Sequence, residues 1–300
     1  MFNASVAFHR KTFRLPLPSR TLTLGKRTLV MGVVNVTPDS FSDGGLFLDT
    51  RSAVSRALQS EKDGADILDI GGESTRPGAD AVPAADQLAR VLPVLEKLRG
   101  KLRIPISIDT SSAEVAEAAA KAGAEILNDV TGLRAGSRLA EVARRRKLAL
   151  ILMHMRGDPR TMQKRPFPRD VMGEVISGLR RSVAVAQRVG VAPNKIILDP
   201  GIGFGKTYAQ NYELIARLHE FARLGFPLLV GTSRKKFIAR VLDGRPATER
   251  VFGTAATVAA CILNGAHIVR VHDVAEMAQV ARVTDAVLSP RSVARIPKPP

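Results

Sequence analysis

The sequence predicts an α/β fold, a closed (β/α)8 TIM barrel with an N-terminal β-hairpin. Eight short apolar runs rich in β-branched residues each end in a polar residue or lead into polar residues, and helical patterns lie between them. Strict alternation of strand and helix predicts a parallel sheet. Eight such units within 300 residues fit a barrel, which commonly takes ~250 residues as one domain. An open, doubly wound sheet is the alternative, because spacing alone does not establish closure.

The elements follow one another in a regular order. Residues 13–17 and 22–24 alternate apolar and polar side chains around Pro-Ser-Arg, which predicts a hairpin that caps the barrel bottom. The strand-like runs cover residues 28–35, 66–70, 105–109, 125–128, 148–153, 195–199, 226–231 and 267–271. Helical spacing is clear in residues 51–63, 84–99, 112–122 and 171–189. We therefore expect an N-terminal extension and hairpin (1–27), a single catalytic barrel (28–289) and a tail (290–300).

The charge of the chain raises a different hypothesis about function. Its 45 Lys+Arg against 28 Asp+Glu leave a net charge of +17, which would also suit a nucleic-acid-binding protein. The cations are scattered, however, and aromatic residues make up only 4% of the chain with no Trp, so a base-stacking platform is not expected. We predict a solvated basic surface and no specific nucleic-acid partner. No apolar run is long enough for a signal peptide or a membrane span, which predicts a cytoplasmic protein without a membrane partner.

The stretch that follows the first predicted strand, residues 35–45, carries the strongest functional signal. An apolar pattern stops at Asn35 and passes into polar side chains and glycine around a single aromatic residue, Phe41. Asn35 and Asp43 are among the residues that present oxygen atoms there. A loop of this composition does not serve to pack a core, so it predicts a binding site for an oxygen-ligated metal or a polar heterocycle.

Polar residues also follow the other predicted strands. In a (β/α)8 barrel the C-terminal ends of the strands surround one mouth. Amides and carboxylates at such a mouth can bind the donors of a flat heterocycle, while cations hold an anionic group attached to it. No Ser/His/Asp nucleophile motif or zinc-ligand spacing competes with this interpretation. The strand-end positions are Asn35, residues 71–76, Asp109, Asn128, Met153, Asp199, residues 233–235, Arg270 and His272.

These residues lie in motifs by which the chain resembles the dihydropteroate synthases, enzymes of folate biosynthesis that join a pterin diphosphate to 4-aminobenzoate. The resemblance extends over nearly the whole chain, and the N-terminal ~27 residues lie outside its strong motifs. It implies a transferase that condenses 6-hydroxymethyl-7,8-dihydropterin diphosphate with 4-aminobenzoate and releases diphosphate by a dissociative path. The motifs cover residues 35–45, 71–78, 107–110, 127–130, 153–157, 199–206, 231–235 and 270–272.

The resemblance implies a role for each of these positions. It assigns pterin binding to Asp109, Asn128, Met153, Asp199, Lys235 and Arg270. It assigns diphosphate binding to Asn35, Arg76, Arg270 and His272, with Mg2+ as cofactor and Asn35 as its protein ligand. The 4-aminobenzoate pocket falls to Phe41, Thr75, Pro77, Phe204, Ser233 and Lys235. Catalysis falls to Asp43, Arg76, Lys235, Arg270 and His272.

Residue chemistry supports parts of this assignment independently. A carboxylate such as Asp199 can accept the adjacent donors of a pterin edge, much as it accepts an arginine fork. Ser233 stands where a helical pattern begins, so free amides there could bind the benzoate carboxylate. An aryl sulfonamide has a similar shape and acceptor pattern, so such compounds are expected to compete with 4-aminobenzoate.

Two other functions stay open at this stage. A pterin-binding barrel that transfers methyl groups from a methyltetrahydrofolate-type donor would have no use for the loops at residues 35–45 and 75–76. An inactive relative would be expected to have lost Asn35, Arg76, Asp199, Lys235 or Arg270, and all are present. The resemblance also implies a homodimer that takes small-molecule substrates.

Overall fold

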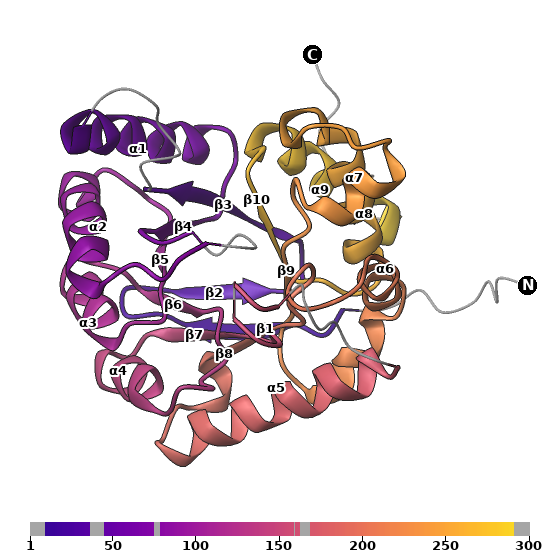
Figure 1. The fold of residues 1–300 in the computed structure, drawn as a ribbon, viewed down its shortest axis with the longest axis horizontal. Helices are drawn as coiled ribbons and strands as arrows, with labels where there is room; N and C mark the ends of the chain where they lie inside the picture. Colours follow the sequence, from indigo (N-terminus) through magenta and orange to yellow (C-terminus); the bar gives the residue numbers. More distant parts are fainter. Residues whose placement is uncertain (1–9, 37–44, 75–78, 159, 163–168, 291–300) are drawn as a thin grey trace, which may run out of the picture.

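The computed structural model describes residues 10–36, 45–74, 79–158, 160–162 and 169–290, without the side chains of residues 45–49. Within these ranges eight parallel strands form one sheet in the order β8-β7-β6-β5-β4-β3-β10-β9, and a separate antiparallel pair precedes them. Figure 1 shows the sheet curled into a ring with helices around its outside. The predicted α/β barrel is confirmed.

The strands lie close to the eight predicted runs. The hairpin consists of β1 (Phe13–Pro16) and β2 (Thr21–Leu24). The barrel strands are β3 (Leu29–Asn35), β4 (Ile67–Gly71), β5 (Ile106–Asp109), β6 (Ile126–Asp129), β7 (Ala149–Met153), β8 (Ile196–Asp199), β9 (Leu229–Val230) and β10 (Ile268–Val271). β9 is much shorter than the run of residues 226–231 that predicted it.

Helices alternate with these strands, as the apolar spacing predicts. They are α1 (Gly45–Lys62), α2 (Ala84–Leu98), α3 (Ala113–Lys121), α4 (Arg138–Arg146), α5 (Val171–Arg188), α6 (Tyr208–Ala216), α7 (Lys236–Val241), α8 (Val251–Leu263) and α9 (Val274–Leu288). In the part of the chain that the structure describes, the connections contain three short 3-10 helices, η2 (Pro193–Lys195), η3 (Leu218–Leu224) and η4 (Ala247–Glu249). No described helix is long and apolar enough to cross a membrane.

The sheet closes between β8 and β9, and the open-sheet alternative is therefore wrong. Leu198 on β8 forms a parallel bridge with Leu228, and its amide donates to the carbonyl of Pro227 at 3.0 Å. This junction is thin compared with the continuous ladder between β3 and β4. Closure brings the ends of β8 and β9 to neighbouring positions on the mouth of the barrel.

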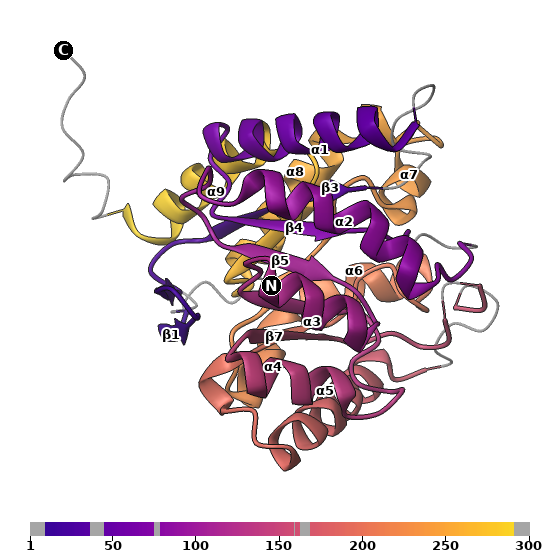
Figure 2. The ribbon, with the colours of Figure 1, turned by 90° about the vertical axis from the view of Figure 1, so that its left-hand side faces the viewer.

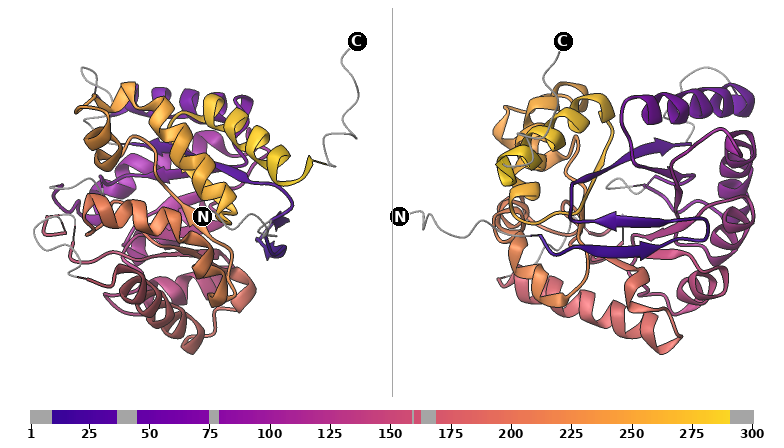
Figure 3. Two further views of the ribbon diagram at one scale, coloured as in Figure 1. Left: turned by 90° about the vertical axis from the view of Figure 1, so that its right-hand side faces the viewer. Right: turned by 180° about the vertical axis from the view of Figure 1, so that it is seen from behind.

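The hairpin covers the end of the barrel at which the strands begin. Leu15, Leu17 and Leu24 are buried in one cluster with inward-facing strand residues such as Met31 and Ile67. Figure 2 shows β1 at the end of the barrel away from the tip of the β4 arrow, and the right panel of Figure 3 shows the hairpin crossing that end. The hairpin thus fills the barrel bottom with apolar side chains and leaves the opposite mouth for function, as predicted.

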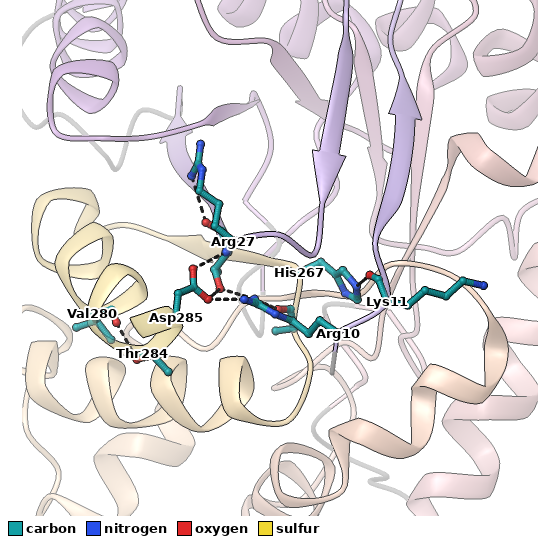
Figure 4. A network of polar contacts seen from close by, with 9 residues as sticks. Arg10, Lys11, Arg27, His267, Val280, Thr284 and Asp285 are labelled. Atoms are coloured by element: carbon teal, nitrogen blue, oxygen red, sulfur yellow. Dashed lines mark hydrogen bonds and ion pairs between the residues drawn. The ribbon is translucent and has the colours of Figure 1, made fainter. Parts of the chain in front are cut away.

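A polar network ties the segment before the hairpin to the C-terminal part of the barrel (Figure 4). The guanidinium of Arg10 pairs with Asp285 on α9 and donates to the carbonyl of Ala266 at 2.9 Å. The second carboxylate oxygen of Asp285 accepts the amide of Thr28 at 2.6 Å. The start of β3, α9 and the N-terminal segment are therefore held together at the barrel bottom.

His267 connects the same segment to Leu228, the residue before β9. Its Nδ1 accepts the amide of Leu228 at 3.1 Å, and its Nε2 lies 3.0 Å from the carbonyl of Lys11. Only the neutral ring with its proton on Nε2 satisfies both contacts, since a carbonyl can only accept. Burial lowers the pKa of His267 to about 4, in agreement with this neutral form.

Candidate active site

A cavity of about 640 Å³ opens at the C-terminal mouth of the barrel. Every predicted site residue that the structure describes lines it, although the residues come from seven different strands or the segments that follow them. Parallel strand ends converge at the mouth of a barrel, which is why positions far apart in sequence meet here. The residues brought together are Asn35, Asp109, Asn128, Met153, Asp199, Phe204, Ser233, Lys235, Arg270 and His272.

Arg270 is held between two carboxylates at one side of the cavity. Its Nε donates to Oδ2 of Asp69 at 2.6 Å, and its Nη2 donates to Oδ2 of Asp109 at 2.9 Å. Oδ2 of Asp69 also accepts Nδ2 of Asn128 at 2.9 Å. Strands β4, β5, β6 and β10 each contribute one member of this cluster, so their register sets the orientation of the guanidinium.

The electrostatics of this cluster leave one carboxylate easy to protonate. Burial raises the pKa of Asp109 well above its ordinary value, and the charge of Asp69 raises it further. Arg270 works in the opposite direction. Two buried carboxylates around one cation suit a ligand edge that supplies hydrogen-bond donors, because such donors stabilise the charged form.

Asp199 lies at the end of β8 and begins a glycine loop, residues 199–206. Its Oδ1 accepts the amide of Gly201 at 2.7 Å. Burial raises the pKa of Asp199, while the attraction of Lys235 opposes the rise. Gly201 has a φ of +68°, and a Cβ there would lie 1.9 Å from the carbonyl oxygen of His154, so a larger residue cannot occupy this turn.

Lys206 holds the glycine loop together from within. Its Nζ donates to the carbonyls of Gly201 at 2.8 Å, Phe204 at 2.9 Å and His154 at 3.3 Å, and only 2% of the residue is exposed. Burial lowers the pKa of Lys206 to about 7, although Asp199 counteracts this effect. The three carbonyls match the three donors of the ammonium, so the charged form is the one that satisfies the loop.

Lys235 faces Asp199 across the cavity mouth. It lies just before α7, its Nζ donates to the carbonyl of Ile202, and the same atom lies 4.6 Å from the centre of the Phe204 ring. Burial lowers the pKa of Lys235 to about 8, and the charge of Asp199 limits the decrease. A Cβ on Gly203 would come within 2.9 Å of the Lys235 side chain, so this glycine provides space for the lysine.

An apolar wall lies beside these polar groups. Val130, Met153, Met155 and Met162 form a small buried cluster, and Phe204 packs against it. Methionine side chains adapt their shape and contact aromatic rings favourably. The cavity therefore combines an apolar face for a flat ring with polar groups around the edge, which is the usual composition of a small-molecule site.

Ser233 orients His272, which is a different arrangement from the predicted helix start. The Ser233 hydroxyl oxygen accepts the amide of His272 at 3.2 Å and lies 3.1 Å from its Nδ1. A hydroxyl that accepts the amide can donate its own hydrogen to Nδ1, which places the imidazole proton on Nε2. Helix α7 begins only at Lys236, so the prediction that Ser233 opens a helix is wrong. Arg234 lies between Ser233 and the start of α7, and its φ of +62° prevents the helix from beginning earlier.

Asn35 at the end of β3 lines the cavity, and its side chain carries a neutral amide oxygen. Within the described ranges, no three His, Cys, Asp or Glu residues are grouped closely enough to hold a metal ion. Mg2+ commonly keeps water and phosphate oxygens and takes only one or two ligands from protein. The donor set therefore fits a magnesium ion that arrives with an anionic substrate better than a permanently bound metal.

Five predicted site residues lie outside the described ranges: Phe41, Asp43, Thr75, Arg76 and Pro77. Conversely, Asp69, Lys206 and Asn211 contribute to the site and were not predicted. Asn211 accepts the amide of Gly203 at 2.6 Å and donates to the carbonyl of Thr207 at 2.8 Å. A charged residue inside the apolar pattern of β4 was the available signal for Asp69, because buried charge requires a partner.

Comparison with known proteins agrees with this geometry. Residues 31–272 match the family described as pterin binding enzyme. A dihydropteroate synthase from Synechocystis sp. is 50% identical over 273 residues, which cover 91% of this chain and 94% of that relative. The structure of Xanthomonas albilineans dihydropteroate synthase with 4-aminobenzoic acid has a TM-score of 0.86 and 40% identity, covering 96% of this chain and 100% of that one. A Yersinia pestis dihydropteroate synthase in complex with a sulfonamide drug gives a TM-score of 0.87 at 41% identity, with coverage of 92% and 100%.

Proposed function

The chain belongs to the dihydropteroate synthase family of pterin-binding enzymes, and we propose that its cavity condenses 6-hydroxymethyl-7,8-dihydropterin diphosphate with 4-aminobenzoate. The products are 7,8-dihydropteroate and diphosphate. One observation carries the proposal beyond family membership: buried acceptors at Asp109, Asn128 and Asp199 lie in the same cavity as the cation of Arg270 and the ring of His272. A pterin diphosphate needs both, since its ring edge is rich in donors and its tail is anionic.

The pterin ring is proposed to occupy the inner part of the cavity. Asp199 would accept the paired donors of the 2-amino group and ring N3, and Lys235 would donate to the acceptor side of the ring. Met153 and the guanidinium of Arg270 would contact the ring faces. Such a site discriminates strongly against rings without those groups, because its buried polar atoms would be left unpaired.

The diphosphate is proposed to lie nearer the mouth, where Arg270 contributes positive charge and the neutral ring of His272 contributes a hydrogen-bond donor, its Nε2–H. Arg76 has the same proposed role and lies outside the described residues. As the exocyclic methylene C–O bond breaks, negative charge grows on the leaving diphosphate, and these groups stabilise it. The pterin delocalises the positive charge left on carbon, which supports a dissociative path.

The second half of the reaction forms the new bond. The lone pair of the 4-aminobenzoate amine attacks the methylene carbon, the C–N bond forms, and the nitrogen loses a proton. Phe204, Ser233 and Lys235 are proposed to line the 4-aminobenzoate pocket together with Phe41, Thr75 and Pro77. Asp43 is proposed to lie near the cationic centre or the attacking amine. Aryl sulfonamides should compete for this pocket, as the Yersinia pestis complex with such a drug suggests.

A magnesium ion is the proposed cofactor, with Asn35 as its protein ligand. When bound, Mg2+ would supply electrostatic stabilisation to the charge that develops on the diphosphate. The neutral amide of Asn35 suits this ion because the substrate itself brings the negative charge. We further propose that the enzyme acts in the cytoplasm, where we expect its small-molecule substrates.

A homodimer is the proposed assembly. Three large apolar side chains are strongly exposed on two neighbouring helices: Phe252 on α8 at 85%, and Val283 and Val287 on α9 at 66% and 64%. Helices α8 and α9 pack against each other, so these residues belong to one side of the barrel. Association would remove this apolar surface from water.

The deciding experiment measures diphosphate release from the purified protein. Release should require both the pterin diphosphate and 4-aminobenzoate, stop on chelation and return with Mg2+. Asn35→Ala should raise the Mg2+ concentration needed for half-maximal rate. Full turnover in the presence of chelator would reject the metal role, whereas release that ignores 4-aminobenzoate would reject the synthase function. Methyl transfer from a methyltetrahydrofolate donor would instead support the methyl-transfer alternative.

A further inference from the structure

Asp69 lies directly behind the ligand-lining residues without lining the cavity itself. It is on β4, is completely buried, and uses a single oxygen, Oδ2, to accept both Arg270 Nε at 2.6 Å and Asn128 Nδ2 at 2.9 Å. Its other oxygen has no hydrogen-bond partner among the described residues. One hidden carboxylate thus contacts two residues that face the ligand.

The contact with Asn128 determines which end of the amide faces the ligand. A carboxylate only accepts hydrogen bonds, so the amide nitrogen of Asn128 must point to Asp69. The opposite orientation would place the amide oxygen against a negatively charged oxygen with no hydrogen between them. The Asn128 oxygen is therefore the group left for the cavity, and it can only accept.

The contact with Arg270 has a related effect on the guanidinium. Nε is occupied by Asp69 and Nη2 by Asp109, so two donors in a fixed plane are already used. A planar guanidinium held at two positions cannot rotate about its long axis. Its remaining donors and its flat face are the parts available to a ligand.

We propose that Asp69 is a positioning residue: it fixes the Asn128 amide and the Arg270 guanidinium so that the pocket presents acceptors to a donor-bearing ring edge. This inference rests on the proposed pterin-binding function and adds a determinant of its specificity. Without Asp69, the Asn128 amide could turn and donate, and the pocket would accept a ring that carries an acceptor at that edge.

Two substitutions at position 69 distinguish this role from ordinary packing. Asp69→Ala removes both hydrogen bonds. Asp69→Asn can keep both, because its amide oxygen can replace Oδ2 while its nitrogen turns toward Ser107, the register partner whose buried hydroxyl has no partner among the described residues. Val33→Ala is the matched control, since Val33 is the register partner on the other side and makes a cavity without changing the hydrogen bonds.

The experiment measures calorimetric affinities for 6-hydroxymethylpterin and for 6-hydroxymethyllumazine, in which an oxo group replaces the 2-amino group. The amino group has two N–H donors, of which one is assigned to Asp199 and the other to the Asn128 oxygen. Asp69→Ala should reduce the preference for the pterin by at least about tenfold, because a site that stops pairing a ligand group stops discriminating for it. Asp69→Asn and Val33→Ala should stay within about threefold of the parent protein. In turnover, Asp69→Ala should raise the KM for the pterin diphosphate and leave the KM for 4-aminobenzoate unchanged.

Other outcomes separate the possible failures. An unchanged preference in Asp69→Ala overturns the inference, and so does an equal loss in Val33→Ala, which would indicate packing alone. Should Asp69→Ala fail to fold, Asp69→Ser replaces it, because it keeps an oxygen in the buried position but is too short to reach both partners. Failure of the parent protein to bind the pterin would count against the proposed function instead.

Discussion

The buried carboxylate of Asp199 is unfavourable for folding but favourable for ligand binding. In the free protein its charge is desolvated, and the raised pKa reflects the cost of keeping it ionised. A ligand that donates two hydrogen bonds removes that cost. The residue therefore contributes more to the complex than to the fold.

Asp199→Asn should consequently fold as well as the parent protein and bind pterin poorly. The variant can still accept the amide of Gly201, but its NH2 group would face one of the two ligand donors. The expected loss is ~1.5 to 3 kcal/mol, or roughly 10- to 150-fold in affinity. Calorimetry with 6-hydroxymethylpterin measures it, and Asp243→Asn, at an exposed position, is the control. Unchanged affinity would show that Asp199 does not contact this edge.

His267 should make the stability of the fold depend on pH. Its pKa is about 4 in the fold against an ordinary 6.5, so between these values the unfolded chain binds more protons than the folded protein. The free energy of unfolding should rise with pH across this window and reach its full value above about 6.5. At 1.36 kcal/mol per pKa unit the contribution is ~3 kcal/mol.

His267→Gln removes the titrating ring, so it isolates this contribution from that of other groups. Denaturant unfolding at pH 7.5 and pH 5 should give a larger difference for the parent protein than for the variant. The same difference in both would assign the pH dependence to other residues.

The sequence predicted the residues that line the cavity better than the buried residues that hold them in position. Asp109, Asn128, Asp199 and Arg270 stand at strand ends, where position alone implies the barrel mouth. Asp69 stands inside a strand, and nothing local indicates that it pairs with Arg270 from β10, which is 201 positions away. Such support depends on strand register, and register appears only once the sheet has closed.

At the scale of elements, the glycine loop depends on the one lysine at its end. Lys206→Met would leave the carbonyls of His154, Gly201 and Phe204 without their donor, and each unmet buried acceptor costs ~1 to 3 kcal/mol. We expect a lower melting temperature and a weaker affinity for pterin, since Asp199 and Phe204 belong to the same loop. Lys121→Met, at an exposed position, controls for the lost charge. A variant with parental stability and pterin affinity would contradict this role.

The elements themselves were largely predictable, with informative exceptions around β9 and α7. Apolar periodicity located all eight barrel strands, because buried strands and amphipathic helices leave strong patterns. It overestimated the length of β9, because regular strand pairing covers only two residues between Pro227 and Gly231. It also started α7 too early, because a positive φ at Arg234 is set by tertiary contacts such as its ion pair with Asp273.

At the scale of the whole molecule, the exposed side of α8 and α9 should decide the oligomeric state. Phe252→Glu should convert a dimer into a monomer, because a charge at the centre of an apolar contact is costly to bury. Ala184→Glu is the control, as it adds the same charge at an exposed position of α5. Light scattering coupled to gel filtration measures the mass. A dimer that persists in Phe252→Glu would place the interface elsewhere.

Among the residues that the structure describes, the barrel closes between β8 and β9 through a single isolated bridge, so this junction is the weakest part of its hydrogen-bonded wall. Asp199 is the last residue of β8, and Lys235 lies in the segment that follows β9. A pterin bound to both residues would therefore link the two strands at the mouth of the barrel. Amides of Leu198 and Leu229 should therefore exchange with solvent deuterium faster than those of Leu68 and Ile70 in the free protein. Bound pterin should slow the exchange of Leu198 and Leu229 more than the exchange of Leu68 and Ile70. While it is bound, the substrate would bridge β8 and β9, and its release would return this part of the barrel wall to faster local opening.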